Sequence, residues 1–310
     1  MSQTISKNKA LLFVEIAGDF LTSIAKFILG FLGGSAAMIA EGFHSLADTS
    51  NQIFLLIGIE NSKKPADKTH PFGYGKERFF WSFVSALFIM IFSGGMAIWR
   101  GVKSIGSSEG ISNFKISFLV LGIALLFQVF NLFLSSKYFR LKARKPKTIQ
   151  GIIHQLKLIK EPTIINLWLG DIVAVGGNLL AGVALYLVLI TGNAVYDAVA
   201  SIIIGIALVG LGIFLAKDSR DLLIGEAVTP AMYEEIAKII RSCSEVEGIA
   251  VLKTMHLTPN EILINADVEF KKGLKTWQIE KAIDEIENRI KSQIPAAKQI
   301  FIEVESENSG

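Results

Sequence analysis

Long apolar segments constrain this chain more than any other feature of its sequence. A helix needs about 20 apolar residues to cross a bilayer, and six segments approach that length: 11–33, 36–59, 79–100, 114–136, 163–191 and 194–216. Residues 217–310 have the charge content of a soluble domain instead. With 51% hydrophobic residues overall, the chain exceeds what a soluble core needs. We therefore predict an α-helical membrane protein, with six transmembrane helices in a domain over 1–216 and a second domain over 217–310.

Basic residues are distributed unevenly around these segments. Lys and Arg precede the first segment and follow the second and the fourth, whereas the other connections carry little charge. Cytoplasmic loops hold the excess of Lys and Arg, so both termini are predicted to face the cytoplasm or the equivalent inner compartment of an organelle. We interpret the densest run, 137–147, as a topology anchor and not as a nucleic-acid surface. The expected location is the inner cell membrane in a prokaryote and an organelle membrane in a eukaryote.

Beyond residue 217 the pattern changes to that of a small α/β domain. Apolar positions at helical spacing predict helices over 230–243 and 276–292. Alternating apolar and polar residues predict strands over 248–257 and 261–270, and a last strand is expected over 299–303. The order α-β-β-α-β predicts a ferredoxin-like sheet with its helices on one face.

The second apolar segment carries a polar stripe. Its members are separated by three, four and three residues, which places them on one helix face; they are Glu41, His44, Asp48 and Asn51. An ionisable side chain within a membrane span costs about 2.5–3.5 kcal/mol on insertion scales, so those that persist there are functional candidates. His44 and Asp48 lie one turn apart and can bind one cation through a neutral ring nitrogen and a carboxylate oxygen. A structural His–Asp hydrogen bond is the alternative.

The fifth segment contributes a further carboxylate, Asp171, with no basic residue near it in the sequence. Leu167 and Val175, one turn away on either side, offer no donor atom, and Asn178 lies two turns away on a similar face. Mixed nitrogen and oxygen ligation suits Zn²⁺, and also Fe²⁺, Co²⁺ and Mn²⁺. Zinc prefers about four ligands, so the sequence leaves one ligand missing.

Other polar residues in the segments allow either a structural or a functional interpretation. They are Glu15, Asp19 and Lys26 in the first segment, Gln128 and Asn131 in the fourth, and Asp197 at the outer edge of the sixth. The first group either forms an internal ion pair or lines an inner vestibule. The two amides are interpreted as hydrogen-bond partners between helices. Asp197 either caps a helix or belongs to an outer polar rim.

Two sequence motifs carry a resemblance to a known family. The stretch AEGFHSLADTSNQ at 40–52 and the stretch HPFGYGKERF at 70–79 resemble the signature of the cation diffusion facilitator family, especially the branch of the mitochondrial zinc transporters and their prokaryotic relatives. The stretch LLIGE at 222–226 is similar to that family's link into its C-terminal domain. The resemblance covers nearly the whole chain. It implies a homodimeric exporter that alternates between inward and outward states and exchanges one metal ion for protons.

The resemblance also implies a tetrahedral site made by two residues of the second span and two of the fifth. His44 and Asp48 match the first pair, and Asp171 matches one member of the second. Leu167 or Val175 stands where the other member is expected. Water, Asn178 or a residue of the first span would then fill the fourth place. The predicted metal ligands are thus His44, Asp48 and Asp171.

Taken together, the sequence predicts a Zn²⁺ efflux transporter that works as a metal/proton antiporter without an organic cofactor. Protonation of His44 or Asp48 weakens metal binding, so a pH gradient can drive release. The alternatives are a transporter of the same fold for Mn²⁺, Fe²⁺ or Co²⁺ and a membrane metal sensor without flux. An enzyme is not predicted, because no H-E-x-x-H-like arrangement accompanies the ligands. The single cysteine, Cys243, excludes a disulfide framework and a site with several thiolates.

Overall fold

The computed structural model describes residues 2–105, 114–142 and 159–305, and the side chains of 2–15, 141 and 142 lie outside that description. The chain divides into two compact units. The first comprises Met1–Lys63 and Glu77–Arg220, and the second comprises Lys64–Lys76 and Asp221–Gly310. The domain boundary after residue 216 stays a prediction, and each unit is described by itself below.

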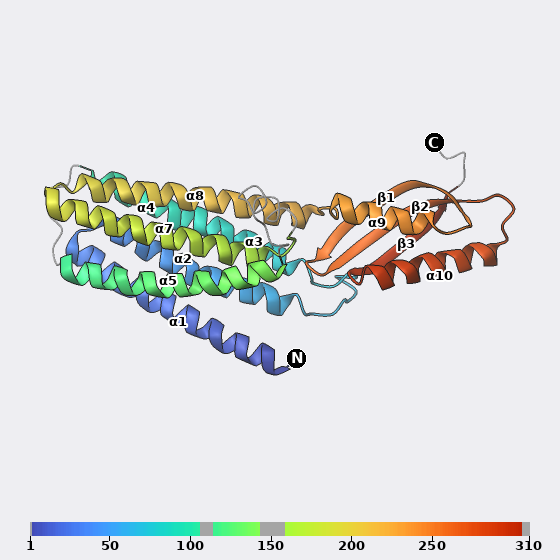
Figure 1. Cartoon of the computed structure of the whole chain (residues 1–310), viewed down its shortest axis with the longest axis horizontal. Coiled ribbons are helices and arrows are strands. Elements are labelled where there is room, and N and C mark those ends of the chain that lie inside the picture. The colour runs from blue at the N-terminus through green and yellow to red at the C-terminus, as the bar shows by residue number, and fades with distance from the viewer. Residues whose placement is uncertain (1, 106–113, 143–158, 306–310) are drawn as a thin grey trace. The chain divides into compact units, whose positions relative to one another are not determined.

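The first unit is a bundle of long helices (Figure 1). They are α1 (Ser2–Gly33), α2 (Ala36–Asn61), α3 (Glu77–Phe88), the π-helical turn η1 (Ile89–Gly94), α4 (Gly95–Ser104), α5 (Phe114–Lys142), α7 (Pro162–Thr191) and α8 (Val195–Ile224). In the part of the chain that the structure describes, five helical segments are long and apolar enough to cross a membrane: Ile16–Gly33, Glu77–Ser104, Phe114–Arg140, Pro162–Thr191 and Val195–Ile224. Five of the six predicted spans are thereby confirmed as apolar helices.

Helix α2 is the sixth predicted span, and its polar face sets it apart from the other five. Its 26 residues give a length of about 39 Å at 1.5 Å per residue, enough to cross the hydrocarbon core. It contacts α1, α3, η1, α4 and α7, so the polar face is covered by protein. Polar side chains within a membrane are expected to face the interior of a bundle in this way. That α2 itself crosses the membrane stays a prediction.

Helix α8 extends beyond the predicted end of the last span. The apolar pattern stops at residue 216, yet the helix continues to Ile224. Loss of hydropathy marks the end of a membrane-spanning stretch and not the end of a helix, because charged residues such as Lys217 and Arg220 are good helix formers. The predicted basic anchor begins on α5, and its residues 143–147 lie outside the described residues.

Asp197 of α8 caps the N-terminus of α2. Ser35 Oγ donates a hydrogen bond to Asp197 Oδ1 at 2.7 Å. The backbone N–H groups of Ala36 and Ala37 both donate to Asp197 Oδ2. A carboxylate is favoured at a helix N-terminus, where backbone N–H groups lack partners within the helix. Of the two interpretations of Asp197, capping is confirmed, and the capped helix is α2 instead of α8.

Glycines allow α8 to approach η1 and α4 closely. A Cβ atom added at Gly205 would lie 2.8 Å from the carbonyl oxygen of Gly94 and 2.8 Å from the backbone nitrogen of Ile98. A Cβ added at Gly94 would lie 2.9 Å from the backbone nitrogen of Val209. Because the atoms in the way belong to the backbone, no side-chain rotation relieves the overlap. Small residues at the contact are the usual basis of close helix packing in membranes.

We expect Gly205→Ala to destabilise the bundle by about 1–3 kcal/mol, the usual cost of overpacking. Gly210→Ala is the matched control on the same helix, because a Cβ there meets nothing within 4 Å. It is expected to be neutral or to stabilise by up to about 1 kcal/mol through helix propensity. Thermal unfolding of the detergent-solubilised protein measures both effects. Equal unfolding midpoints for the two variants would contradict the close packing at Gly205.

The second unit contains α9 (Pro230–Arg241), β1 (Val246–Thr258), β2 (Glu261–Phe270), α10 (Thr276–Gln293) and β3 (Ala297–Glu305). The sheet order is β1-β2-β3; β1 pairs antiparallel with β2, and β3 pairs parallel with β2 after the α10 crossover. Alternate residues of β2, among them Ile264 and Val268, are buried in a cluster with Ile240 of α9 and Ile286 of α10. Since alternate residues face one side of a strand, both helices cover the same face. The predicted α-β-β-α-β domain is confirmed.

The segment Lys64–Lys76, which carries most of the second sequence motif, folds with this unit. Lys76 Nζ donates to the carbonyl oxygen of Leu223 at 3.2 Å. The ring of Phe72 packs edge-on against Phe301 of β3, with 6.4 Å between the ring centroids. The connection between α2 and α3 is therefore part of the α/β unit, although it lies between two helices of the bundle in the sequence.

Candidate functional site

His44 is buried on α2 without the hydrogen bonds that a buried imidazole normally makes. Its side chain is 1% exposed, and neither ring nitrogen has a hydrogen-bond partner among the described residues. Nε2 lies 3.6 Å from Asp48 Oδ2, beyond the usual range of a hydrogen bond. The structural His–Asp hydrogen bond is therefore not made. Buried polar atoms are nearly always satisfied, so an unsatisfied imidazole indicates a missing partner such as an ion.

A small cavity lies between α1, α2, α5 and α7, and carboxylates from three helices line it. The cavity is about large enough for one water molecule or one metal ion. Its lining residues are Asp19 of α1, Asp48, Asn51 and Gln52 of α2, Gln128 and Asn131 of α5, and Leu167, Gly170, Asp171 and Ala174 of α7. Two of the predicted ligands, Asp48 and Asp171, thus meet at one cavity although they are far apart in the sequence.

The three predicted ligands do not surround one point in this structure. His44 lies one turn before Asp48 on α2, and Asp171 lines the cavity from α7. Within residues 2–105, 114–142 and 159–305, no three His, Cys, Asp or Glu side chains are gathered tightly enough to hold a metal ion. Joint ligation by His44, Asp48 and Asp171 therefore stays a prediction. It requires the side chains to move together when the ion enters.

Glu41 belongs to the polar stripe of α2, but it pairs with a basic residue and does not line the cavity. Lys26 Nζ of α1 donates to Glu41 Oε2 and to Ser45 Oγ, both at 3.0 Å, and neither Lys26 nor Glu41 is exposed. Gly177 of α7 leaves the space for this carboxylate, because a Cβ there would overlap Glu41 Oε1. The ion pair expected within the first span is thus made to α2 instead. The side chain of Glu15 lies outside the described residues.

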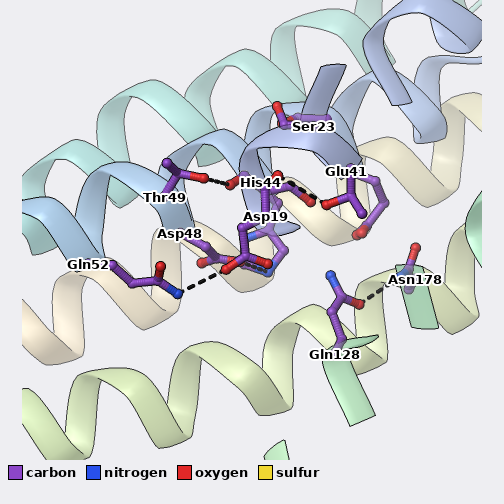
Figure 2. A network of polar contacts seen from close by, with 12 residues as sticks. Asp19, Ser23, Glu41, His44, Asp48, Thr49, Gln52, Gln128 and Asn178 are labelled. Carbon is purple, nitrogen blue, oxygen red and sulfur yellow. Dashed lines mark hydrogen bonds and ion pairs between the residues drawn. The ribbon is translucent and has the colours of Figure 1, made fainter. Parts of the chain in front are cut away.

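The amides around the cavity divide into two groups. Asn178 Nδ2 donates to Gln128 Oε1 at 2.6 Å (Figure 2), which confirms Gln128 as a hydrogen-bond partner between helices. Asn178, one option for the fourth ligand, is absent from the described lining of the cavity. Asn131 does line the cavity, and its Oδ1 has no hydrogen-bond partner within the described part of the chain.

Asp19 is the candidate whose position the sequence did not reveal. Its side chain is 5% exposed, and Gln52 Nε2 donates to its Oδ2 at 2.9 Å. Figure 2 shows Asp19 and Asp48 pointing into the same space, with His44 close by. A signal was present, because Asp19, Ser23 and Lys26 recur at helical spacing and give α1 a polar face of its own. The sequence did not show that this face packs on α2 and α5.

Comparisons with known proteins agree with this architecture. A family model described as the cation efflux transmembrane domain matches residues 12–224, and one described as the cation efflux protein, cytoplasmic domain, matches residues 228–307. Together the two matches span both predicted domains.

Three relatives illustrate the range of similar proteins. Metal tolerance protein C4 of Arabidopsis thaliana is 31% identical over 253 residues, which cover 81% of this chain and 55% of that protein. The human mitochondrial proton-coupled zinc antiporter SLC30A9 is 26% identical over 260 residues, covering 84% and 45%. The manganese efflux system protein MneP of Bacillus subtilis is 26% identical over 316 aligned positions, covering 97% and 96%. The chain spans about half the length of the first two relatives.

Proposed function

The chain belongs to the cation efflux family, the cation diffusion facilitators, and from that premise we propose that it exports Zn²⁺ across a membrane in exchange for protons. Members of this family are transporters and not enzymes, and the chain is a multi-pass membrane protein. One observation carries the proposal: Asp48 and Asp171 line one cavity between the helices, and the imidazole one helical turn from Asp48 has no hydrogen-bond partner among the described residues.

Zn²⁺ is the first candidate for the transported ion. Imidazole combined with carboxylate is a ligand set that zinc favours, and one similar protein is named a zinc antiporter. Mn²⁺ is the second candidate, because carboxylates and amides dominate the cavity and hard oxygen ligands suit manganese. A relative that the chain matches over nearly its full length is named a manganese efflux protein.

Proton exchange follows from the chemistry of the proposed ligands. Histidine must be neutral and aspartate ionised to bind a metal ion, so protons and metal compete for His44, Asp48 and Asp171. A site that opens to an acidic compartment exchanges metal for protons, and the same site opening to a more alkaline compartment does the reverse. Alternating access of one cavity therefore couples the two fluxes.

We also propose a homodimer with both termini in the cytoplasm or in the inner compartment of an organelle. The second unit matches a family domain named as cytoplasmic, and the bias of Lys and Arg around the apolar segments supports the same orientation. The transported ion would then enter from the cytoplasm or from the inner compartment of the organelle. The proposed location is the inner cell membrane of a prokaryote or an organelle membrane of a eukaryote.

Flux measurements on the purified full chain in lipid vesicles test this function. With a zinc indicator inside and an acidic interior, Zn²⁺ is expected to accumulate, and an ionophore that dissipates the pH gradient is expected to abolish the accumulation. Competition by Mn²⁺, Fe²⁺ and Co²⁺ ranks the metals. A protein that binds Zn²⁺ and changes conformation but shows no flux would be a sensor, which would refute the proposal.

A further inference from the structure

The cavity contains one carboxylate more than the proposed ligand set uses. Leu167, one turn before Asp171 on α7, lines the cavity without any donor atom. Asp19 of α1 lines the same cavity. The helix α7 therefore provides no ligand at position 167, but α1 provides a carboxylate, Asp19, at the same cavity.

We infer that Asp19 is the fourth ligand of the transported metal ion, in place of a ligand at position 167. The inference rests on the proposed function, because it completes the same site. Asp19 is almost fully buried, and it lines the same cavity as Asp48 and Asp171. The hydrogen bond from Gln52 Nε2 to Asp19 Oδ2 fixes the orientation of the carboxylate, as partners of metal ligands commonly do.

Two amide oxygens give independent evidence that the cavity takes a cation. Asn131 Oδ1 and Gln52 Oε1 are both buried at its wall, and neither has a hydrogen-bond partner within the described ranges. Carbonyl oxygens are acceptors only, so they are satisfied by a donor or by a positive ion. The described lining contains no basic side chain. A cation in the cavity would satisfy both amide oxygens, and the three carboxylates that line the cavity supply the negative charge that attracts it.

A purely structural role for Asp19, as an acceptor for Gln52, makes a different prediction. Asp19→Asn retains an oxygen at the position that accepts from Gln52 Nε2, but it removes the negative charge. If Asp19 only orders Gln52, this variant is expected to bind metal like the native protein. If Asp19 is a ligand, the Asp19→Asn variant is expected to bind metal at least about 10- to 100-fold more weakly. Mutation of a residue that only hydrogen-bonds to a metal ligand already costs this much.

Zn²⁺ binding to the purified full chain, measured by titration calorimetry, distinguishes these cases. We expect Asp19→Asn and Asp48→Asn each to lose at least about 10-fold in affinity. The double variant Asp19→Asn/Leu167→Asp returns a carboxylate to the cavity from α7 and is expected to recover most of the loss. Native affinity in Asp19→Asn alone overturns the inference and leaves the proposed function standing. Native affinity in Asp48→Asn as well overturns both.

A spectroscopic experiment tests contact between position 19 and the ion directly. In a Cys243→Ser background, which removes the one native thiol, Asp19→Cys is expected to give a cobalt–thiolate charge-transfer band when Co²⁺ is added. Ser23→Cys is the matched control, one turn further along α1 and also buried, and it is expected to give no such band. Co²⁺ bound to Asp19→Cys without the band, or with an equal band in Ser23→Cys, overturns the inference.

Discussion

Asp48→Asn is expected to lower Zn²⁺ flux into vesicles by at least about 100-fold. Mutation of a residue that only hydrogen-bonds to a metal ligand costs up to about 100-fold in affinity or activity, and loss of a ligand is expected to cost at least as much. The substitution retains the size of the side chain but removes the charge at the point where α2 meets the cavity. Asp48 is also the proposed ligand whose carboxylate lies 3.6 Å from His44 Nε2, so the substitution also removes this negative charge from beside the imidazole. The initial rate of indicator response in reconstituted vesicles measures the effect.

Glu60→Gln is the matched control for this experiment. It makes the same change from carboxylate to amide on α2, but the side chain of Glu60 is 52% exposed and lies outside the described lining of the cavity. Glu60 contacts Lys63 at 2.8 Å, and an exposed pair of this kind contributes only about 0–1 kcal/mol. Native flux is expected. Equal losses in the two variants, or native flux in Asp48→Asn, would remove Asp48 from the site.

Lys26→Met is expected to destabilise the bundle by about 3–5 kcal/mol, the usual result of removing one partner from a buried ion pair. The substitution leaves the carboxylate of Glu41 without its ammonium partner, at a position with no exposed surface. Unfolding of the solubilised protein in a denaturing detergent measures the change. The Lys26–Glu41 pair also joins α1 to α2, the helices that carry Asp19 and Asp48. Loss of the pair is therefore expected to weaken metal binding as well.

The double variant Lys26→Met/Glu41→Gln distinguishes the loss of an attraction from the burial of an unpaired charge. Neither side chain at this buried position is charged in the double variant, so most of the stability lost in Lys26→Met is expected to return. Lys63→Met is the control, because its pair with Glu60 is exposed and is worth about 1 kcal/mol or less. A double variant that is as unstable as Lys26→Met would show that the cost lies in packing and not in charge.

Local sequence patterns predicted the helices and strands because each of these elements is determined largely by residues that are close together in the sequence. Segment length and hydropathy identified the five apolar helices, and alternation identified the strands of the α/β unit. The pairing of β3 with β2 is parallel and joins residues on either side of α10. No local pattern fixes such a pairing, because it depends on how the crossover helix packs on the sheet.

The sequence by itself determined the pair His44 and Asp48, since a spacing of four places two residues on one face of any helix. It also indicated that Asp171 needs a partner in the membrane. Only the tertiary structure decided which helix faces which. It paired Lys26 with Glu41, used Asp197 to cap α2, and brought Asp19 to the cavity of Asp48 and Asp171. The reason is physical: helical periodicity fixes the relative orientation of residues within one helix, whereas the rotation of each helix toward its neighbours is set by packing among all of them.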